Sequence, residues 1–379
     1  MPVISFAHKT THWIFCCVAG LSLTMCTGDL NQPAVSSNMA TLAAPAGKSP
    51  SMRGVCWTAS DSLGGECMVP VKKLSVNWIS QTPFGWQDAH NKPEIGMSFK
   101  TGYLWGELDH GLSYTTSIAH EKGIKTMLKP HLWMTGRQGK WRSEISMDSE
   151  EDWKKWFENY GIFILHYAEL AEKTGMESLC IGTELHMSIK ERPDDWRALI
   201  KKIRQVYSGQ ITYAANFYEE YEDLTFWDDL DFIGIQGYFP LTKSENPSLE
   251  ELKAGWEEHV KAIKKVSDKY GKKVVFTEVG YKSTRDAAIK PWEWPDRRSA
   301  SYADTSNLTQ QRCYEAMFQT FADKEWVDGF FIWKWHPRLS MATPEQLAAS
   351  KRSNFPAIGF TPQKKPAEQT MAKWYKKWE

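Results

Sequence analysis

The chain has 379 residues, and its 46 Lys and Arg residues balance its 46 Asp and Glu residues. This balance argues against nucleic acid or another polyanion as the binding partner. The length suits a single large α/β barrel with a substantial core.

Residues 1–26 have the features of a signal peptide. An apolar run at 13–23 follows a short basic segment and is too short to span a bilayer as a mature helix. It ends in Leu-Thr-Met-Cys, which resembles a bacterial lipobox with Cys26 as the lipidated residue, although Met25 stands where a small residue is usual. We expect an exported, membrane-anchored lipoprotein, periplasmic or on the cell surface, with ordinary secretion or a retained anchor as alternatives.

Residues 27–50 are rich in Ser, Ala, Pro, Asn and Gly, which predicts a flexible tether before a folded domain at 51–379. No cysteine pair has metal-ligand spacing. Cys56 and Cys67 are close enough in sequence for a disulfide in an oxidising compartment, and the sequence leaves this pairing open. Cys180 lies in a predicted strand and is expected to be a buried thiol.

From residue 51 onward, strand-like and helix-like segments alternate. Short apolar runs bounded by Gly and polar residues predict eight strands. They lie at 55–57, 76–79, 124–130, 179–184, 211–216, 232–238, 274–278 and 329–335.

Apolar residues three and four positions apart predict helices between these strands. The helical segments are 151–173, 194–207, 249–270 and 308–321, with a further helix near 111–121. Gly175 is the expected stop of the first of these long helices. The Lys-rich tail after Lys364 is expected to form a solvated terminal helix. Alternating strands and helices predict parallel strands with right-handed crossovers, and eight such strands predict a single (β/α)8 TIM barrel of the α/β class.

Tryptophan is unusually frequent, with 19 residues. Flat indole rings suit the apolar faces of sugars, and packing in the core is the alternative use. Core packing accounts well for the Trp residues of the predicted helices. It does not readily explain Trp292 and Trp294, which stand in the polar segment 282–307. In a barrel this segment would lie over the face that carries the active site.

Two predicted strands end on a glutamate, Glu184 after the fourth and Glu278 after the seventh. A carboxylate at the exit of a buried strand is costly to desolvate unless it has a partner or a purpose. A structural ion pair at each strand end is one explanation. The other is that both strands belong to one barrel, where the two glutamates form the carboxylate pair of a glycosidase.

A barrel places its functional groups at the carboxyl ends of its strands. There the sequence offers side chains suited to a sugar site: Trp57, Asn77 or Gln81, His131, Trp133, Glu184, Asn216, Tyr238, Glu278, Trp333 and Trp335. No serine-hydrolase elbow, Gly-rich phosphate loop or His-Glu-x-x-His motif occurs, so we expect carboxylate chemistry with no metal or cofactor.

The order and spacing of four motifs resemble glycoside hydrolase family 113, a β-mannanase family of the retaining clan A. These motifs are Ile-Gly-Thr-Glu-Leu at 181–185, Gly-Ile-Gln-Gly-Tyr at 234–238, Phe-Thr-Glu-Val-Gly-Tyr at 276–281 and Trp-Lys-Trp at 333–335. The similarity covers about residues 51–340.

The resemblance implies that Glu184 is the general acid/base and Glu278 the nucleophile. Tyr238 would donate a hydrogen bond to the nucleophile, and Trp333 or Trp335 would form the floor of the sugar subsite at the cleavage point. The wider clan usually has Asn before the acid/base, where this chain has Thr183. The resemblance therefore does not define which group contacts the C2 hydroxyl of the substrate sugar, and it leaves the preferred configuration at C2 open.

The leading interpretation is an exported, retaining β-mannanase or β-mannosidase. Another clan A specificity, such as a β-glucanase, is the second. A surface lipoprotein that binds glycans without cleaving them is the third, and the presence of both glutamates and Tyr238 counts against it. The expected partner is an oligosaccharide or polysaccharide, with membrane contact only through a lipid on Cys26.

Overall fold

The computed structural model describes residues 49–102, 104–136, 139–295, 305–343, 346 and 358–379. The expected signal peptide and nearly all of the expected tether lie outside these residues. No helix within the described ranges is long and apolar enough to cross a membrane.

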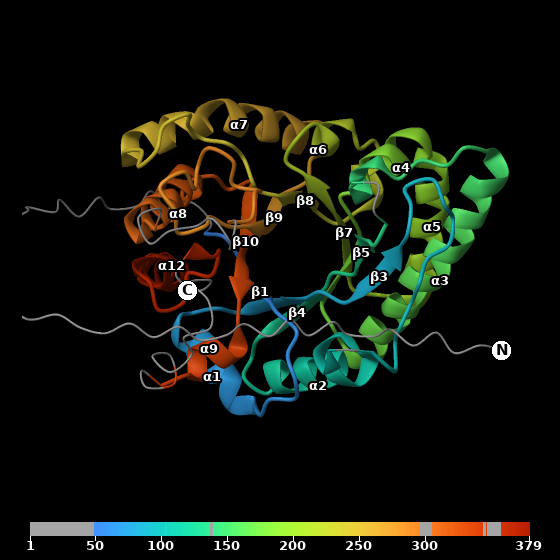
Figure 1. Cartoon of the computed structure of the whole chain (residues 1–379), viewed down its shortest axis with the longest axis horizontal. Helices are drawn as coiled ribbons and strands as arrows, with labels where there is room; N and C mark the ends of the chain where they lie inside the picture. Colours follow the sequence, from blue (N-terminus) through green and yellow to red (C-terminus); the bar gives the residue numbers. More distant parts are fainter. Residues whose placement is uncertain (1–48, 103, 137–138, 296–304, 344–345, 347–357) are drawn as a thin grey trace, which may run out of the picture. The chain divides into compact units, whose positions relative to one another are not determined.

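The eight predicted strands form a closed parallel barrel, seen along its axis in Figure 1. Neighbouring strands follow the order β1-β10-β9-β8-β7-β6-β4-β2, and β2 closes the ring against β1. The barrel strands are β1 Met52–Trp57, β2 Trp78–Gln81, β4 Lys125–Leu128, β6 Ser178–Thr183, β7 Gln210–Asn216, β8 Ile233–Gln236, β9 Val274–Val279 and β10 Val327–Trp335.

Two barrel strands continue beyond the ring as a separate pair. β3 (Phe84–Gln87) follows β2, β5 (His131–Met134) follows β4, and the two pair in parallel. A proline precedes each extension, Pro83 and Pro130. Proline has no N–H to donate, so the sheet is interrupted at both points. The predicted third strand, 124–130, therefore corresponds to β4 alone, and the separate strand β5 beyond it carries His131.

Helices surround the barrel (Figure 1), and the five helical ranges predicted from the sequence lie close to the bounds of α2, α3, α5, α7 and α8. The longest, α3, starts at the cap Ser149, whose hydroxyl accepts from the Asp152 amide, and ends at Gly175 with φ of +71°. The described helices are α1 Met68–Lys73, α2 Asp109–His120, α3 Glu150–Thr174, α4 His186–Glu191, α5 Pro193–Val206, α6 Glu220–Asp223, α7 Leu249–Tyr270, α8 Asn307–Phe321, α9 Pro337–Met341 and α12 Pro366–Lys377.

The terminal helix corrects one expectation. α12 is not simply solvated, because Met371 and Tyr375 on one face are fully buried. The Tyr375 hydroxyl donates to the backbone oxygen of Gly54 in β1 at 2.9 Å. Apolar residues at helical spacing lie between the lysines of this helix in the sequence. They form one face, which packs on α8 and the barrel.

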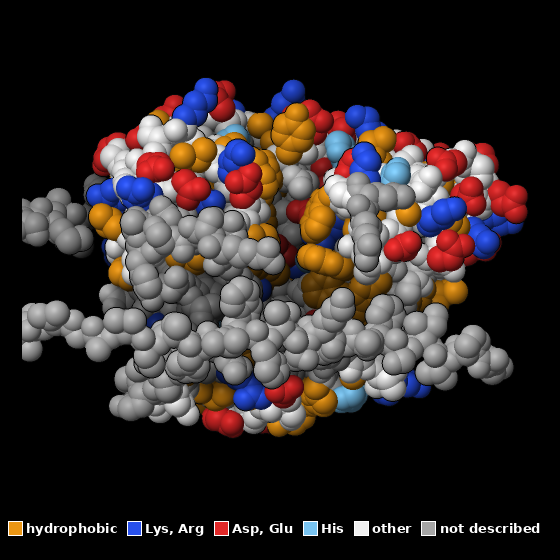
Figure 2. Space-filling model, viewed as in Figure 1, with side chains coloured by type: hydrophobic (Ala, Val, Ile, Leu, Met, Phe, Trp, Pro, Cys, Tyr) orange, Lys and Arg blue, Asp and Glu red, His pale blue; other side chains and the backbone are white. Residues whose placement is uncertain are grey.

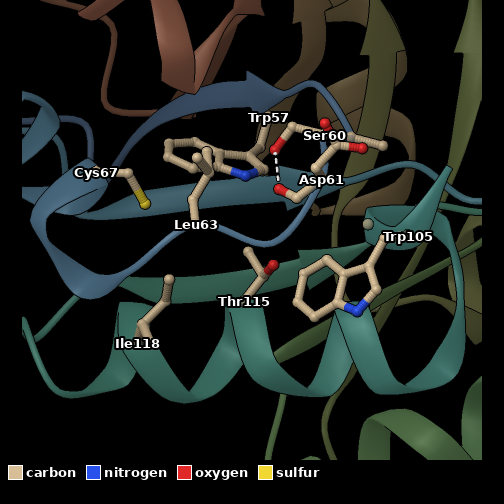
Figure 3. Close-up of a pocket in the computed structure, with 10 residues that line it drawn as sticks. Trp57, Ser60, Asp61, Leu63, Cys67, Trp105, Thr115 and Ile118 are labelled. Atoms are coloured by element: carbon tan, nitrogen blue, oxygen red, sulfur yellow. Dashed lines mark hydrogen bonds between the residues drawn. The ribbon is translucent and has the colours of Figure 1, made fainter. Parts of the chain in front are cut away.

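The disulfide left open between Cys56 and Cys67 is absent, because both are free thiols. Cys56 lies inside the barrel, where its Sγ faces the backbone oxygens of Thr277 and Phe331. Cys67 lies outside it, in a small pocket beside Trp57 (Figure 3). Cys180 is buried, as expected.

Candidate active site

The carboxyl ends of the barrel strands open into a cavity of about 1160 Å³. The face drawn in Figure 2 is hollowed at its middle, with hydrophobic side chains at the rim of the hollow. Eight of the side chains proposed from the sequence line this cavity. They are Trp57, His131, Trp133, Glu184, Asn216, Tyr238, Glu278 and Trp333.

Trp335 was also proposed from the sequence, and the structure corrects its assignment. Its side chain is fully buried in the core and does not line the cavity. Strand alternation would put Trp333 and Trp335 on one face. However, β10 carries one extra residue relative to β1, because Val55 pairs with Ile332 while Trp57 pairs with Trp335. A bulge of this kind redirects the side chains that follow it.

The second strand supplies neither of the side chains considered for the site. Asn77 lies just before β2, and its side chain forms hydrogen bonds with the backbone of Ser51 and Arg53. Gln81 is buried and donates to the Thr116 hydroxyl at 2.8 Å. Thr183 is also buried and does not line the cavity.

Glu278 is nearly buried, and three groups surround its carboxylate. Tyr238 donates to Oε2 at 2.9 Å, which is the hydrogen bond expected from the sequence. Burial, then the charge of Glu278, holds the pKa of Tyr238 well above its ordinary value, so the phenol keeps its proton. Lys129 Nζ forms an ion pair with Oε1, and His131 Nε2 lies 3.6 Å from the same oxygen.

His131 is neutral in this setting. Burial, with Arg142 and Lys129 nearby, holds the pKa of His131 well below its ordinary value. Its Nδ1 lies 3.5 Å from Arg142 Nη1, which only donates, so the ring proton is assigned to Nε2. That Nε2 has no hydrogen-bond partner among the described residues. A buried N–H donor is therefore available beside Glu278 for a ligand oxygen.

Glu184 is held by a different set of groups, all acting on one oxygen. Trp141 Nε1 donates to Oε2 at 3.1 Å, and Arg142 donates to it twice, from Nη2 at 2.7 Å and Nε at 3.2 Å. Arg142 is buried and also binds the Leu132 backbone oxygen. The other oxygen, Oε1, makes no hydrogen bond within the described part of the chain.

The backbone of Glu184 is also unusual, with φ of +52°. A non-glycine residue in this left-handed region needs support from its surroundings. The next amide, Leu185 N, donates to the Tyr213 hydroxyl at 2.6 Å, and Tyr213 donates to Glu220 Oε1 at 2.5 Å. Glu220 is fully buried, and burial raises the pKa of its carboxyl to about 8. Its Oε2 accepts from the Asn216 amide, which connects the ends of β6 and β7.

Aromatic side chains form the walls of the cavity. Trp133 and Trp141 meet edge to face with centroids 5.7 Å apart, and both are exposed at the rim. Trp292 stacks on Phe217 at 5.2 Å on another wall. Trp294 and Trp333 also line the cavity, and so Trp292 and Trp294, the two tryptophans of the segment 282–307, lie at the site as expected. Exposed indole faces around a cleft suit the apolar faces of sugar rings.

Sequence reasoning missed the two residues that hold Glu184. Trp141 and Arg142 lie after β5, at the start of the one-turn 3-10 helix Arg142–Glu144, and no strand or helix pattern in the sequence marks them. Lys129 was not proposed as a site residue either, because its contact with β9 has no signal in the sequence. No group of three His, Cys, Asp or Glu side chains in the described ranges has the geometry to hold a metal ion.

Comparison with known proteins places the chain in a family. The model of glycoside hydrolase family 113 matches residues 57–356. A search of curated proteins returned no match.

Solved structures of the family are similar over nearly their whole length. A β-mannanase from Alicyclobacillus acidocaldarius, in complex with ManMIm, has 26% identity and a TM-score of 0.70, covering 87% of this chain and 98% of its own. A β-1,4-mannanase has 25% identity and a TM-score of 0.70, covering 86% and 99%. A β-glucuronidase from Ruminococcus gnavus, at 13% identity and a TM-score of 0.53, covers 86% of this chain and 49% of its own and shares the fold alone. The chain therefore belongs to glycoside hydrolase family 113 and is a glycoside hydrolase.

Proposed function

We propose that this protein hydrolyses β-linked mannose-containing oligosaccharides or polysaccharides with retention of configuration, using Glu278 as nucleophile and Glu184 as general acid/base. One observation carries the assignment. The two carboxylates face one cavity, and each is held differently, Glu278 by donors on both oxygens and Glu184 by donors on Oε2 alone. Donors on both oxygens favour the ionised carboxylate that a nucleophile requires.

The general acid role follows from the free oxygen of Glu184. Three donors already occupy Oε2, so the proton of the acid form resides on Oε1. In the first step, a Glu278 oxygen bonds to the anomeric carbon while Oε1–H of Glu184 protonates the departing glycosidic oxygen. In the second step, Glu184 takes a proton from water, the water oxygen bonds to the anomeric carbon, and the ester to Glu278 breaks.

The walls of the cavity support an extended substrate. Its volume of about 1160 Å³ exceeds the usual range for small-molecule sites. We propose that Trp333 is the floor of the subsite at the cleavage point and that Trp57, Trp133 and Asn216 contact neighbouring sugars. His131 would donate its unpartnered Nε2–H to a sugar hydroxyl beside Glu278.

Mannan is the proposed substrate because the similar structures of 25–26% identity are described as β-mannanases. The direct test is hydrolysis of manno-oligosaccharides and cello-oligosaccharides by the full chain, beside Glu184→Gln and Glu278→Gln. We expect cleavage of the manno series, loss in both variants and full activity in chelator. Cleavage of the cello series alone would favour a β-glucanase. Binding without cleavage of either series would favour a glycan-binding protein.

We also propose that the protein is exported and anchored through a lipid on Cys26, as the leader pattern suggests. Export would place the catalytic domain where polysaccharide is available. Metabolic labelling with a fatty acid in a bacterial host is the test, with Cys26→Ser as the matched variant. Label in the parent and none in the variant is expected. Equal labelling, or none in either, would contradict lipidation at this residue.

A further inference from the structure

Lys129 is a buried cation that the two-carboxylate mechanism does not use. It follows β4, and its side chain is fully buried. Its Nζ donates to the backbone oxygen of Thr277 at 3.1 Å and forms an ion pair with Glu278 Oε1. Both contacts are on β9, across the barrel interior from its own strand. A buried ammonium is costly unless it is paired, and here its partner is the nucleophile.

Among the ionisable groups described around Lys129, Glu278 is the one that carries a negative charge near pH 7. Burial raises the pKa of the nearby Cys56 thiol to about 12, and the Cys180 thiol is likewise raised by burial. Both thiols are therefore neutral near pH 7. Tyr238 keeps its proton, and His131 is neutral. The positive charge of Lys129 thus acts chiefly on the carboxylate of Glu278.

We propose that Lys129 is a catalytic residue of the second step, where it stabilises Glu278 as the leaving group; this inference rests on the nucleophile role proposed above. In that step the water oxygen bonds to the anomeric carbon and Glu184 takes the water proton. The bond from the anomeric carbon to Glu278 breaks, and its electron pair returns to the carboxylate. The negative charge then develops beside the Lys129 ammonium, which is already in place.

The two steps respond differently to this cation. In the first step Glu278 loses negative charge as it forms the ester, so Lys129 gains nothing from bond formation. In the second step Glu278 regains the charge, so the ion pair strengthens as the bond breaks. A purely structural ion pair would not distinguish between the steps. The ratio of the two rates is therefore the diagnostic quantity.

The test uses a dinitrophenyl β-mannobioside, whose leaving group needs no acid, with Lys129→Met in the full chain. Dinitrophenolate release reports the first step as a burst, and the steady phase reports the second. We expect the steady phase to fall about 100-fold, the scale for removing one charge-stabilising donor, and the burst to change far less. Intact mass spectrometry should show the glycosylated enzyme accumulating. Equal loss in both phases, or no loss in either, would overturn the proposal.

Two further variants keep the result interpretable. Lys125→Met removes the exposed lysine at the start of the same strand, and both phases should be unchanged. If Lys129→Met does not fold, Lys129→Arg carries the test. It retains the charge, so the ratio of the two phases should stay near that of the parent, and a large fall in that ratio would contradict the proposal. An active Glu278→Gln variant would instead refute the nucleophile assignment itself.

Discussion

The two glutamates of the site differ in where their partners come from. Glu278 lies within the extended strand β9. Of its partners, Lys129 follows β4, Tyr238 follows β8, and His131 begins β5, the strand that comes after β4. Glu184 stands just past β6 with φ of +52°. The groups that contact its carboxylate come from the loop beyond β5. Barrel topology thus fixes the surroundings of one glutamate, while loop conformation fixes those of the other.

This difference is what the two proposed roles, nucleophile and general acid/base, would require of the same residue type. The Glu278 side is built from the ends of parallel strands of the barrel. The Glu184 side has a buried guanidinium and an indole on the carboxylate and a hydrogen-bond network behind its backbone. Changes on the two sides should therefore have different consequences, which the following predictions address.

Removing each carboxylate is expected to have the largest effect. Glu278→Ala should lower kcat by about 10⁴-fold or more, because no covalent intermediate forms. Added azide should restore turnover and give the α-mannosyl azide, with inverted configuration. Glu184→Ala should lower kcat on oligosaccharides by about 10²–10⁴-fold, and added azide should then give the β-mannosyl azide. Proton NMR of the azide products is the measurement, and the opposite pattern of anomers would exchange the two roles.

Substitutions of Arg142 and Tyr238 test the groups that hold Glu184 and Glu278, respectively. Arg142→Met removes two hydrogen bonds and a buried charge from Glu184, and we expect kcat to fall about 100-fold. Tyr238→Phe removes one hydrogen bond from Glu278, and we expect kcat to fall about tenfold.

An activated aryl mannoside separates these two effects. It should restore the first step in Arg142→Met but not in Tyr238→Phe, because only the acid role is bypassed. Single-turnover kinetics measure that step. Arg197→Met, which removes an ion-pairing arginine of α5, is the control and should retain activity. Recovery of both variants, or of neither, would contradict the division of roles.

Glu220, behind Glu184, is expected to make stability depend on pH. Burial raises its folded-state pKa to about 8 from 4.5. A raised pKa means that the folded state binds the proton more tightly, so this contribution to stability is complete below pH 4.5 and is lost as pH rises towards 8. Glu220→Gln should flatten that part of the profile of Tm against pH. Thermal unfolding from pH 4 to 9 tests this, and an unchanged slope would be inconsistent with the assignment.

Trp333 and Trp335 should give the smallest but most selective effects. Trp333→Ala removes a cavity wall, so KM for oligosaccharides should rise several-fold to about 100-fold with Tm nearly unchanged. Trp335→Phe alters the core, so Tm should fall while KM stays the same. Kinetics and thermal unfolding of both variants are needed, and a KM effect for Trp335 alone would restore the original assignment.

The sequence predicts the strand-end half of the site well and the loop half poorly. Glu184, Glu278 and Tyr238 were found because parallel strands bring their carboxyl ends to one edge. Trp141 and Arg142 were not, because contacts of a loop depend on its path and not on any period. Trp335 was misassigned for a third reason, since a one-residue bulge in β10 reverses the expected alternation. The buried face of α12 was not predicted, because the many lysines of this segment indicated a solvated helix although its apolar residues have helical spacing.

The most direct test of the central claim is the anomer released first from a manno-oligosaccharide. Proton NMR during hydrolysis by the full chain resolves the α and β reducing ends before they interconvert. If Glu278 forms a covalent intermediate and Glu184 activates water, the β anomer appears first and the α anomer grows later by mutarotation. Initial release of the α anomer would mean a single displacement, and the assignment of Glu278 as nucleophile would be wrong.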